Sequence, residues 1–297
     1  MKVVSVINYK GGVGKTTITA NLASEMVSKG KKVLVIDLDP QANLTFSYIK
    51  VEEWREGYEK SKTIKHWFDS LVDGTKPVPN FEELIVTQNG VDLICSHLGL
   101  IDVDIELAAG LSAGTERQHK HNFVKTYSYI KNELQKLKDK YEVVLFDCPP
   151  NFSIVTKNAL IASDYYIVPA KMDYLSTLGI NTLKNHVETL VEQYNNYVSD
   201  TEYKVNPQFL GVIATMVAVR NNEPISAQKA YIEQLKRGGI VLFKTMIREN
   251  KTIYADAPEY GIQVVSKNVS PGSTYGQVVT ELKDLTDEFM KKVGVTV

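Results

Sequence analysis

Residues 8–17, NYKGGVGKTT, combine three glycines with two lysines and two threonines. Glycine lets backbone N–H groups turn inward and approach a polyphosphate closely. Lys15 is placed to reach the β- and γ-phosphates of a bound nucleotide, and the Thr16 hydroxyl to coordinate Mg²⁺. Thr17 can donate to the α-phosphate. The run therefore predicts a phosphate-binding loop, because a turn that only needs glycine would not require the Lys-Thr pair.

The same loop departs from the general phosphate-binding pattern in two places. That pattern, G-x-x-x-x-G-K-[ST], would have glycine at position 9, where this chain has Tyr9. An additional lysine, Lys10, follows directly. A loop that cradles one nucleotide does not need two lysines five residues apart, so the role of Lys10 must be sought elsewhere.

Carboxylates end two apolar runs of the chain. Asp37 and Asp39 follow the β-branched run 33–36, and Asp147 ends the run 143–147. Both runs are typical of buried strands, and the carboxyl ends of parallel strands meet beside a bound ligand. Because Mg²⁺ keeps several waters and takes few protein ligands, Asp147 is expected to hold a metal-bound water or the Thr16 hydroxyl. The alternative for Asp37 and Asp39 is that they are loop carboxylates capping a helix.

Strands and helices that would position these groups alternate along the chain. Strands are predicted at residues 3–8, 33–37, 91–95, 143–147, 165–169, 209–215 and 241–245. Helices are predicted at 16–29, 127–140, 175–194, 226–237 and 277–292, the last with Val278, Leu282, Leu285 and Phe289 facing inward. The pattern predicts an α/β fold, a mostly parallel twisted sheet with helices on both faces. We expect one domain over residues 1–297, with a peripheral insertion of helices and loops at about 50–85.

The composition excludes several classes of protein. The 297 residues carry a net charge of −1, so any nucleic-acid surface must be local. Two cysteines, Cys95 and Cys148, lack the spacing of a disulfide framework or a metal site. No apolar run approaches the length that crosses a bilayer, and the N-terminus lacks a signal-peptide cleavage pattern. We therefore take residue 1 as the start of the fold and expect a cytoplasmic protein.

The loop at residues 10–17, KGGVGKTT, resembles the deviant Walker A motif of the ParA/MinD class of P-loop ATPases, position for position. The resemblance implies that Lys15 serves the chain's own nucleotide, whereas Lys10 reaches across a homodimer interface to the phosphates bound by the other subunit. A cation supplied in trans neutralises charge that spreads over the phosphates in the transition state. The alternative is that Lys10 is a solvated loop lysine.

Two further motifs extend the resemblance. DLDPQAN at residues 37–43 resembles the switch I motif of the ParA class, which implies that Asp39 positions the attacking water and Asp37 supports the metal region. DCPP at 147–150 resembles the family's DxPP Walker B motif, with a small buried Cys148 in the variable position. The implied catalytic residues are Lys10, Lys15 and Asp39, and the implied metal-site residues are Thr16, Asp37, Asp39 and Asp147.

Segments in the last third of the chain complete the resemblance. Residues 211–216 and then Arg220 resemble the family segment that approaches adenine, and 246–250 with 257–261 resemble its I-P-R-N and EAPS-G segments. Ile247 stands where proline is usual, and Asp-Ala-Pro-Glu replaces the acidic-Ala-Pro-Ser run. The resemblance implies ATP contacts from Lys10, Gly11, Gly12, Val13, Gly14, Lys15, Thr16, Thr17, Met216, Met246, Ile247 and Arg248, with ATP and Mg²⁺ as cofactors.

A local basic excess lies between residues 229 and 267, with seven basic and four acidic side chains in a chain of net −1. In ParA-like proteins this region binds DNA without sequence preference, and phosphate contacts make such binding steeply salt-dependent. The expected DNA contacts are Lys236, Arg237, Arg248, Lys251 and Lys267. The alternative is an ordinary solvated face of mixed charge.

The resemblance implies a plasmid or chromosome partition ATPase: an ATP-dependent homodimer that binds nucleoid DNA and hydrolyses ATP when a ParB-like centromere-binding partner stimulates it. Basal hydrolysis is expected to be weak. Three alternatives stay open: ParA-like positioning of a cargo other than DNA, a MinD-like membrane-cycling ATPase, and a metabolic enzyme on the same scaffold. The C-terminal run ELKDLTDEFMKKVGVTV is acidic and patterned for packing, so stable membrane association is not expected.

Overall fold

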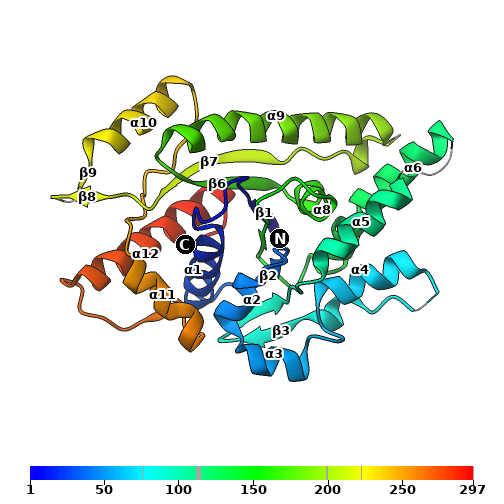
Figure 1. Ribbon diagram of the computed structural model, residues 1–297, viewed down its shortest axis with the longest axis horizontal. Coiled ribbons are helices and arrows are strands. Elements are labelled where there is room, and N and C mark those ends of the chain that lie inside the picture. The colour runs from blue at the N-terminus through cyan, green and yellow to red at the C-terminus, as the bar shows by residue number, and fades with distance from the viewer. Residues whose placement is uncertain (76, 112–114, 199, 222, 297) are drawn as a thin grey trace.

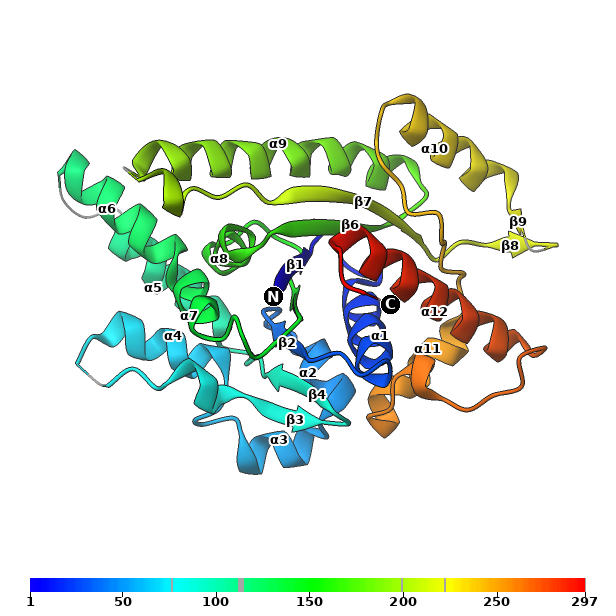
Figure 2. The same cartoon turned by 180° about the vertical axis from the view of Figure 1, so that it is seen from behind.

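The structure, a computed structural model, describes residues 1–75, 77–111, 115–198, 200–221 and 223–296. A seven-stranded sheet in the order β3-β4-β2-β5-β1-β6-β7 lies between helices on both faces (Figure 1, Figure 2). Neighbouring strands are parallel except the antiparallel pair β3 and β4. The strands are β1 Lys2–Val6, β2 Val33–Asp37, β3 Val86–Gln88, β4 Val91–Ile94, β5 Val143–Asp147, β6 Tyr165–Lys171 and β7 Gln208–Thr215. The predicted α/β fold is confirmed.

Twelve α-helices lie in the described residues. Those from the first half of the chain are α1 Lys15–Ser28, α2 Asn43–Tyr48, α3 Val51–Gly57, α4 Ile64–Asp73, α5 Leu100–Leu111, α6 Glu116–Tyr127 and α7 Tyr129–Lys136. The others are α8 Ile154–Ala162, α9 Tyr174–Tyr197, α10 Ser226–Arg237, α11 Lys251–Tyr260 and α12 Thr274–Val293. Three short 3₁₀ turns, η1 Phe81–Leu84, η2 Thr201–Tyr203 and η3 Val264–Ser266, and a small hairpin of β8 Val219–Arg220 and β9 Glu223–Pro224 complete the elements.

Each face of the sheet supports its own hydrophobic core. In β5, Val144 and Phe146 pack into one core, whereas Val143 and Leu145 pack into the other, as the alternation of a strand requires. The first core includes side chains of α4 to α10, and the second includes side chains of α1, α2, α3, α11 and α12. The positions of α12 predicted to face inward, Val278, Leu282, Leu285 and Phe289, are all buried in the second core.

The segment at about 50–85 forms α3, α4 and η1, and it contributes to both cores. Trp54 packs into the second core, and Trp67, Phe68 and Phe81 pack into the first, with the rings of Trp67 and Phe81 centred 4.9 Å apart. Full burial of an aromatic side chain stabilises a fold by about 1.5–3 kcal/mol. Figure 1 shows α3 and α4 along the edge of the molecule that carries β3. The segment was expected to be a peripheral insertion, but it contributes large side chains to both cores.

The strand predicted at 241–245 is wrong. Leu242 makes one isolated bridge to Val212 of β7, and no further ladder is described there. The reason lies in α12: the carboxylate of Glu288 accepts the backbone N–H groups of Lys244 and Thr245 at 2.8 and 2.9 Å. A strand needs those donors for its neighbour, so a distant side chain ends the pairing after one residue.

Both cysteines are free and buried, Cys148 as predicted and Cys95 in addition. Burial raises the pKa of the Cys148 thiol, and the charge of Asp147 raises it further. A thiol held protonated is a poor nucleophile, which agrees with the structural role expected of Cys148. Among the helices of the described residues, none is both long and apolar enough to cross a membrane.

Candidate functional site

The glycine loop joins the end of β1 to the start of α1. Gly12 and Gly14 have φ angles of 66° and 87°, left-handed values that a side chain would disfavour. The carbonyl of Val13 accepts the hydroxyl of Thr215 at 2.8 Å, which ties the loop to the end of β7. Within the described residues no side chain caps the N-terminus of α1. The N–H groups of its first turn are therefore available to an anion.

Lys15 lies inside this loop. Its ammonium donates to the carbonyl oxygens of Asn8 at 3.2 Å and Lys10 at 3.4 Å, and the residue is 7% exposed. Burial lowers the pKa of Lys15, and the charges of Asp147 and Asp39 offset part of that effect. A buried cation beside a helix N-terminus is electrostatically unfavourable until an anion arrives. The position suits a phosphate group.

Lys10 points in a different direction. Its ammonium lies 2.8 Å from a carboxylate oxygen of Asp173 and 3.3 Å from the hydroxyl of Ser176, both at the start of α9. Partial burial alone would raise the pKa of Asp173, but hydrogen bonds from Lys10 and Ser176 outweigh it and lower the pKa. The Lys10 and Asp173 side chains remain 38% and 41% exposed. The second lysine of the loop is therefore directed at the surface rather than at its own phosphate site.

Two carboxylates meet where β2 and β5 end. Asp37 and Asp147 are paired in the strand register, and the Thr16 hydroxyl donates to Asp147 at 2.7 Å. One oxygen of Asp37 accepts both the N–H and the hydroxyl of Thr45, at 2.8 and 2.7 Å, and the other accepts the N–H of Asp39. Asp37 is thus committed to holding the following loop, which fits the supporting role expected of it.

The electrostatics of this pair suit a divalent cation. Burial raises the pKa of Asp147 to about 7. Burial, and then the charge of Asp147, raise the pKa of Asp37 well above its usual range. The Oδ1 atom of Asp147 is buried without a hydrogen-bond partner in the described part of the chain. Two buried carboxyl groups and an unpartnered oxygen beside a threonine hydroxyl fit Mg²⁺, which keeps most of its waters.

The described residues contain no cluster of three or more His, Cys, Asp or Glu side chains arranged to hold a metal. A cation at Asp147 would therefore have few direct protein ligands, with Thr16 and Asp147 nearest and Asp37 and Asp39 around them. This small ligand number is the one expected for Mg²⁺ bound together with a nucleotide.

The raised pKa of Asp147 predicts pH-dependent magnesium binding. Below pH 7 this carboxyl holds a proton that the cation must displace, so affinity falls as pH falls. We expect the Kd for Mg²⁺, titrated calorimetrically into protein saturated with ADP, to be roughly tenfold higher at pH 6 than at pH 8. Asp147→Asn is the control, since any pH dependence that it retains comes from the nucleotide. Equal constants at both pH values in the wild type would contradict the prediction.

Asp39 is held at the mouth of the site by four hydrogen bonds, one of them from the N–H of Ala42 to its carbonyl at 2.8 Å. Its Oδ1 atom accepts the N–H of Gln41 at 3.0 Å, its N–H donates to Asp37, and its carbonyl accepts the hydroxyl of Ser96 at 2.7 Å. The residue is 8% exposed. One carboxylate oxygen remains without a contact within the described residues, which leaves Asp39 able to accept a proton or orient a water.

Two adjoining cavities open from the glycine loop. The larger, about 470 Å³, is lined by the loop and by Asp39, Pro150 and side chains of α1, α2, α11 and η3. The smaller, about 240 Å³, is lined by residues 247–251 and by Lys171. Gly14, Thr17, Met216 and Tyr254 line both. The structure thus brings together Asp39, Met216, Ile247 and Arg248 with the loop residues Gly11, Gly12, Gly14, Lys15, Thr16 and Thr17. Of the other predicted ATP contacts, Lys10, Val13 and Met246 line neither cavity.

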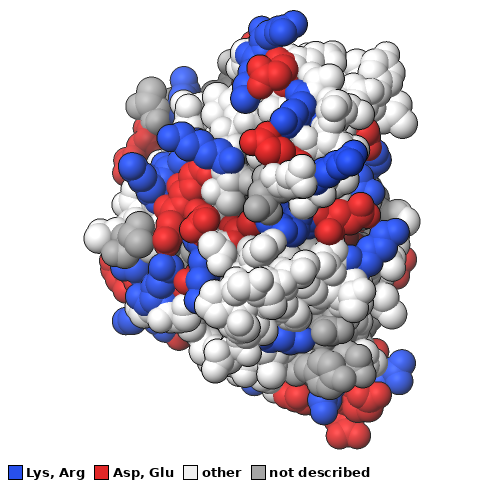
Figure 3. Space-filling view, turned by 90° about the vertical axis from the view of Figure 1, so that its left-hand side faces the viewer, with Lys and Arg blue, Asp and Glu red and all other residues white. Residues whose placement is uncertain are grey.

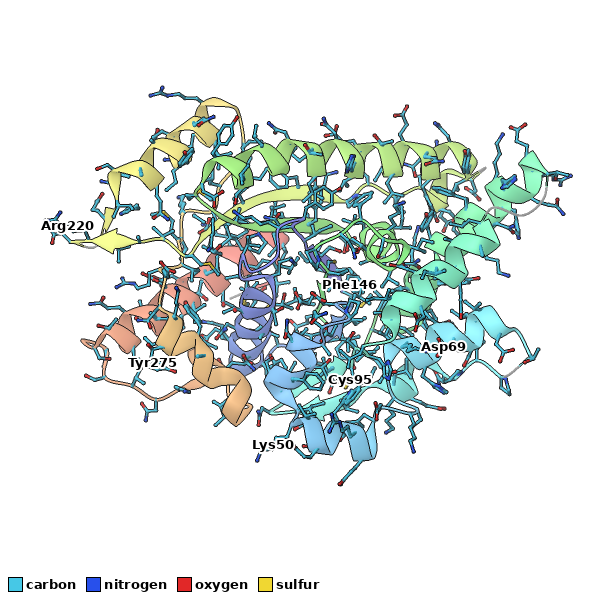
Figure 4. All side chains as sticks on the ribbon, in the orientation of Figure 1. Lys50, Asp69, Cys95, Phe146, Arg220 and Tyr275 are labelled. Carbon is cyan, nitrogen blue, oxygen red and sulfur yellow. The ribbon has the colours of Figure 1, made fainter. Side chains whose placement is uncertain are left out.

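Backbone groups around Ile247 are already engaged. The N–H of Ile247 donates to Ala214, and that of Arg248 to Glu281. The carbonyl of Ile247 also accepts the N–H of Val217 at 3.0 Å, so backbone contacts from this segment to a base would have to come from Met246 or from the carbonyl of Arg248. Arg220, in the segment expected to approach adenine, instead stands exposed on the β8–β9 hairpin, far from the loop (Figure 4). The side chains of residues 256–260 lie outside the described part of the structure.

Sequence reasoning missed Tyr254, Gln263 and Lys171 as lining residues. Tyr254 carries a buried hydroxyl without a partner in the described residues, and burial raises its pKa. Nothing in the local sequence marks these three positions, because they come from α11, the residue before η3 and the end of β6, and they meet only in the folded chain.

The basic residues of the C-terminal third differ in availability. Lys236, Arg237 and Lys251 are exposed, although Lys236 pairs with Glu233 at 2.9 Å. Lys267 lies half-buried with its ammonium 5.4 Å from the centre of the Tyr275 ring. Figure 3 shows that basic and acidic side chains are interspersed over this end of the molecule.

Arg248 does not suit the DNA contact predicted for it. Its guanidinium donates to Glu281 and Gln277 of α12, both at 2.6 Å, and its side chain is 13% exposed. Breaking a partly buried charge pair to reach a phosphate would leave Glu281 unpaired, at a cost of several kcal/mol. We therefore assign the Arg248 side chain to the wall of the smaller cavity.

Comparisons with known proteins agree with this geometry. The model of the AAA domain family matches residues 1–199. The sporulation initiation inhibitor protein Soj of Bacillus subtilis strain 168 is 30% identical over 265 residues, which cover 89% of this chain and 90% of Soj.

Two solved structures share the fold. Cyanothece McdA in complex with ATP matches with a TM-score of 0.73 and 20% identity, covering 100% of this chain and 98% of McdA. A protein of Borrelia burgdorferi B31, described as a plasmid partition protein and bound to AMPPNP, matches with a TM-score of 0.67 and 24% identity, covering 98% and 99% of the two chains. The deviant loop, the strand-end carboxylates and the parallel sheet agree with these matches, and this chain belongs to the AAA-domain family of P-loop ATPases that includes the Soj and ParA partition proteins.

Proposed function

We propose that this chain is an ATP-driven switch: ATP and Mg²⁺ assemble a homodimer, the dimer binds DNA without sequence preference, and a partner protein stimulates hydrolysis and release. The observation that carries the proposal is the divergence of the two loop lysines. Lys15 lies buried in its own loop, whereas Lys10 points outward to Asp173. A cation so placed is available to a nucleotide held by a second copy of the chain.

The surface beside Lys10 supports docking of a second copy. The first turns of α9, directly after Asp173, expose Tyr174, Leu175 and Leu178 at 57%, 68% and 54%. Clustered exposed apolar side chains mark interaction sites on soluble proteins. The Lys10–Asp173 pair is still exposed to solvent in the single chain, so replacing this carboxylate with a phosphate of the second copy would cost little.

Hydrolysis is assigned to groups around the larger cavity. Lys15 stabilises charge on the β- and γ-phosphates, and Lys10 of the second copy adds a further cation. Bound Mg²⁺ would neutralise phosphate charge, with Thr16 and Asp147 holding it. Asp39 orients the attacking water through its available carboxylate oxygen. Each chain alone lacks the second cation, so basal turnover should be slow.

The proposed DNA contacts are Lys236, Arg237, Lys251 and Lys267. A dimer has twice this number of basic side chains. Since each phosphate contact adds to the affinity for DNA, a dimer would bind DNA much more tightly than one copy. The cargo that fits this activity is a plasmid or chromosome carrying a ParB-like centromere-binding protein, with the ATP form on the nucleoid. A second candidate is positioning of a cargo other than DNA by the same dimer and DNA cycle, because the partner protein rather than this chain would select the cargo.

A membrane-cycling role has less support. It would need the apolar face of the C-terminal helix to lie on lipid. Val278, Leu282, Leu285 and Phe289 of α12 are instead buried at 0–1% exposure in the second core. Withdrawing them would remove several fully buried side chains from the fold, at roughly 1.5–3 kcal/mol each.

A DNA titration tests the proposed function. We expect the protein with ATP and Mg²⁺ to retard duplexes of unrelated sequence equally, and the protein with ADP or without nucleotide to bind far less. Raising salt from 50 to 200 mM should weaken the ATP-dependent binding by at least about tenfold, because several phosphate contacts are lost together. Binding that is equal in all nucleotide states, or absent with ATP, would refute the proposal.

A further inference from the structure

An aliphatic strip covers the outer side of α5. Leu98, just before the helix, and Ile101 and Ile105 within it are 59%, 56% and 67% exposed. The inner side of the same helix is also apolar and is buried in the first core through Leu100, Val103 and Leu107. A helix of a soluble protein normally has one apolar face. The second apolar face of α5 has no partner among the described residues.

The strip continues into an acidic hollow beside α4. The hollow, about 530 Å³, is lined by Lys65, His66, Asp69, Ser70, Val72, Asp73 and Glu106. Glu106 follows Ile105 in α5, and the side chain of Lys65 lies against Gly99, so the strip and the hollow form one surface. Among the described residues, this α4–α5 surface also includes exposed Asp102, and its carboxylates outnumber its one described lysine, Lys65, which pairs with Asp69 at 2.6 Å. Aliphatic and acidic side chains complement aliphatic and basic ones.

The α4–α5 surface lies apart from the contact proposed for a second copy. Figure 1 and Figure 2 both show α5 and α6 at the end of the molecule opposite α10, whereas α9 begins on the α10 side. Figure 4 labels Asp69 on α4 at that same end. Lys10 contacts the start of α9. A different protein, rather than a second copy, therefore fits this surface.

α5 is also connected to the nucleotide site. Asp104, between Ile101 and Ile105 in sequence, accepts the backbone N–H of Val155 at 3.0 Å, in the first turn of α8. The chain entering α8 comes directly from Asp147 and Pro150, and Pro150 lines the larger cavity. A ligand on the outer face of α5 is thus separated from the magnesium-side loop by one helix and one hydrogen bond.

We propose that the α4–α5 surface is the docking site for an amphipathic helix of a partner protein, one that presents aliphatic side chains to Leu98, Ile101 and Ile105 and basic side chains to the surrounding carboxylates. We further assign this helix to the partner that stimulates hydrolysis, and only that assignment rests on the proposed function. Binding of the helix would displace α5. The hydrogen bond from Val155 to Asp104 would then transmit this displacement to the start of α8, which follows Asp147 and Pro150 in the chain.

Model peptides test the docking site. The probe is a fluorescent helical peptide of about 16 residues, built from Leu and Lys with an apolar face. Its controls are a scrambled peptide of the same composition and a Leu–Glu peptide of the same pattern. By fluorescence anisotropy, the Leu–Lys peptide should bind wild type at least about tenfold more tightly than either control, since apolar contact and charge both contribute. Added salt should weaken that binding.

Variants locate the binding. Ile101→Asn with Ile105→Asn should weaken the Leu–Lys peptide by about tenfold or more, whereas Val241→Asn, at a residue 48% exposed on another part of the surface, should leave it unchanged. Asp102→Lys with Glu106→Lys removes no apolar group and should reverse the preference toward the Leu–Glu peptide. This second pair keeps the test valid if the asparagine variant does not fold.

Three results would overturn the inference. The peptide could bind wild type and the asparagine variant equally, or the scrambled peptide could bind as tightly, which would show unspecific charge attraction. The asparagine variant could lose its dimer on sizing with a non-hydrolysable ATP analogue, which would assign the surface to a second copy. Peptide binding is measured without nucleotide, so a wild-type chain that fails to dimerise would refute the proposed function and leave this result standing.

Discussion

Lys10→Ala is expected to abolish ATP-dependent dimerisation and partner-stimulated hydrolysis while nucleotide binding persists. The buried Lys15 and the uncapped start of α1 remain to hold the phosphates of the chain's own nucleotide. The lost group is the cation that points away from that site, to Asp173. Cations supplied in trans in related chemistry contribute 10³-fold or more, so stimulated turnover should fall by a factor on the order of 10³.

Sizing with a non-hydrolysable analogue and Mg²⁺, together with stimulated phosphate release, measures this effect. Asp173→Asn is the matched control, because asparagine still caps α9 through Ser176 while the charge that holds Lys10 is gone. That variant should dimerise as well as wild type or better. A wild-type yield of dimer from Lys10→Ala would remove the cross-subunit role of this lysine.

Asp39→Ala should trap an ATP-bound dimer on DNA. Asp39 keeps one carboxylate oxygen uncontacted in the described structure, whereas Asp37 is committed to Thr45 and Asp39. Asp147 also has an uncontacted oxygen, but it lies beside Thr16 on the metal side of the site. Without it, ATP still binds and assembles the dimer, but no carboxylate orients the attacking water. General-base assistance contributes about 10²–10⁴-fold, so hydrolysis should fall by at least about 100-fold while DNA remains bound.

Single-turnover hydrolysis and dissociation from DNA after ATP is removed measure this trap. Asp39→Asn separates chemistry from folding, because asparagine can still accept the N–H of Gln41. Both variants should be slow if the carboxylate is needed for the chemistry. An unaltered rate in Asp39→Ala would refute the catalytic assignment, and a normal rate in Asp39→Asn alone would make the role structural.

The sequence was sufficient for the loop and for the strand-end carboxylates because both depend on local rules. Glycines at 12 and 14 are required by left-handed backbone angles. Asp37 and Asp147 meet because parallel strands end at a common edge, and the register pairs them directly. These relations follow from chain geometry over a few residues and one sheet, which periodicity in the sequence reveals.

The sequence alone could not predict which side chains pair when they lie far apart along the chain. From the sequence, Arg248 was expected to be free to bind DNA. In the structure, both its backbone N–H and its guanidinium donate to Glu281 on α12. The run 241–245 has the composition of a strand, but the N–H groups of Lys244 and Thr245 donate to Glu288 instead of to a neighbouring strand. Each outcome depends on where one turn of α12 lies against the chain, and local propensity carries no information about that.

The sequence by itself predicted that a glycine loop with Lys15 and the carboxylates that end two strands share one edge of a parallel sheet. Only the tertiary structure decided that Lys10 turns to Asp173 rather than inward, that Arg248 belongs to a cavity wall, and that α5 carries a second apolar face. The physical reason is that backbone conformation follows from nearby residues, whereas the partner of a charged or apolar side chain is set by which distant helix packs beside it.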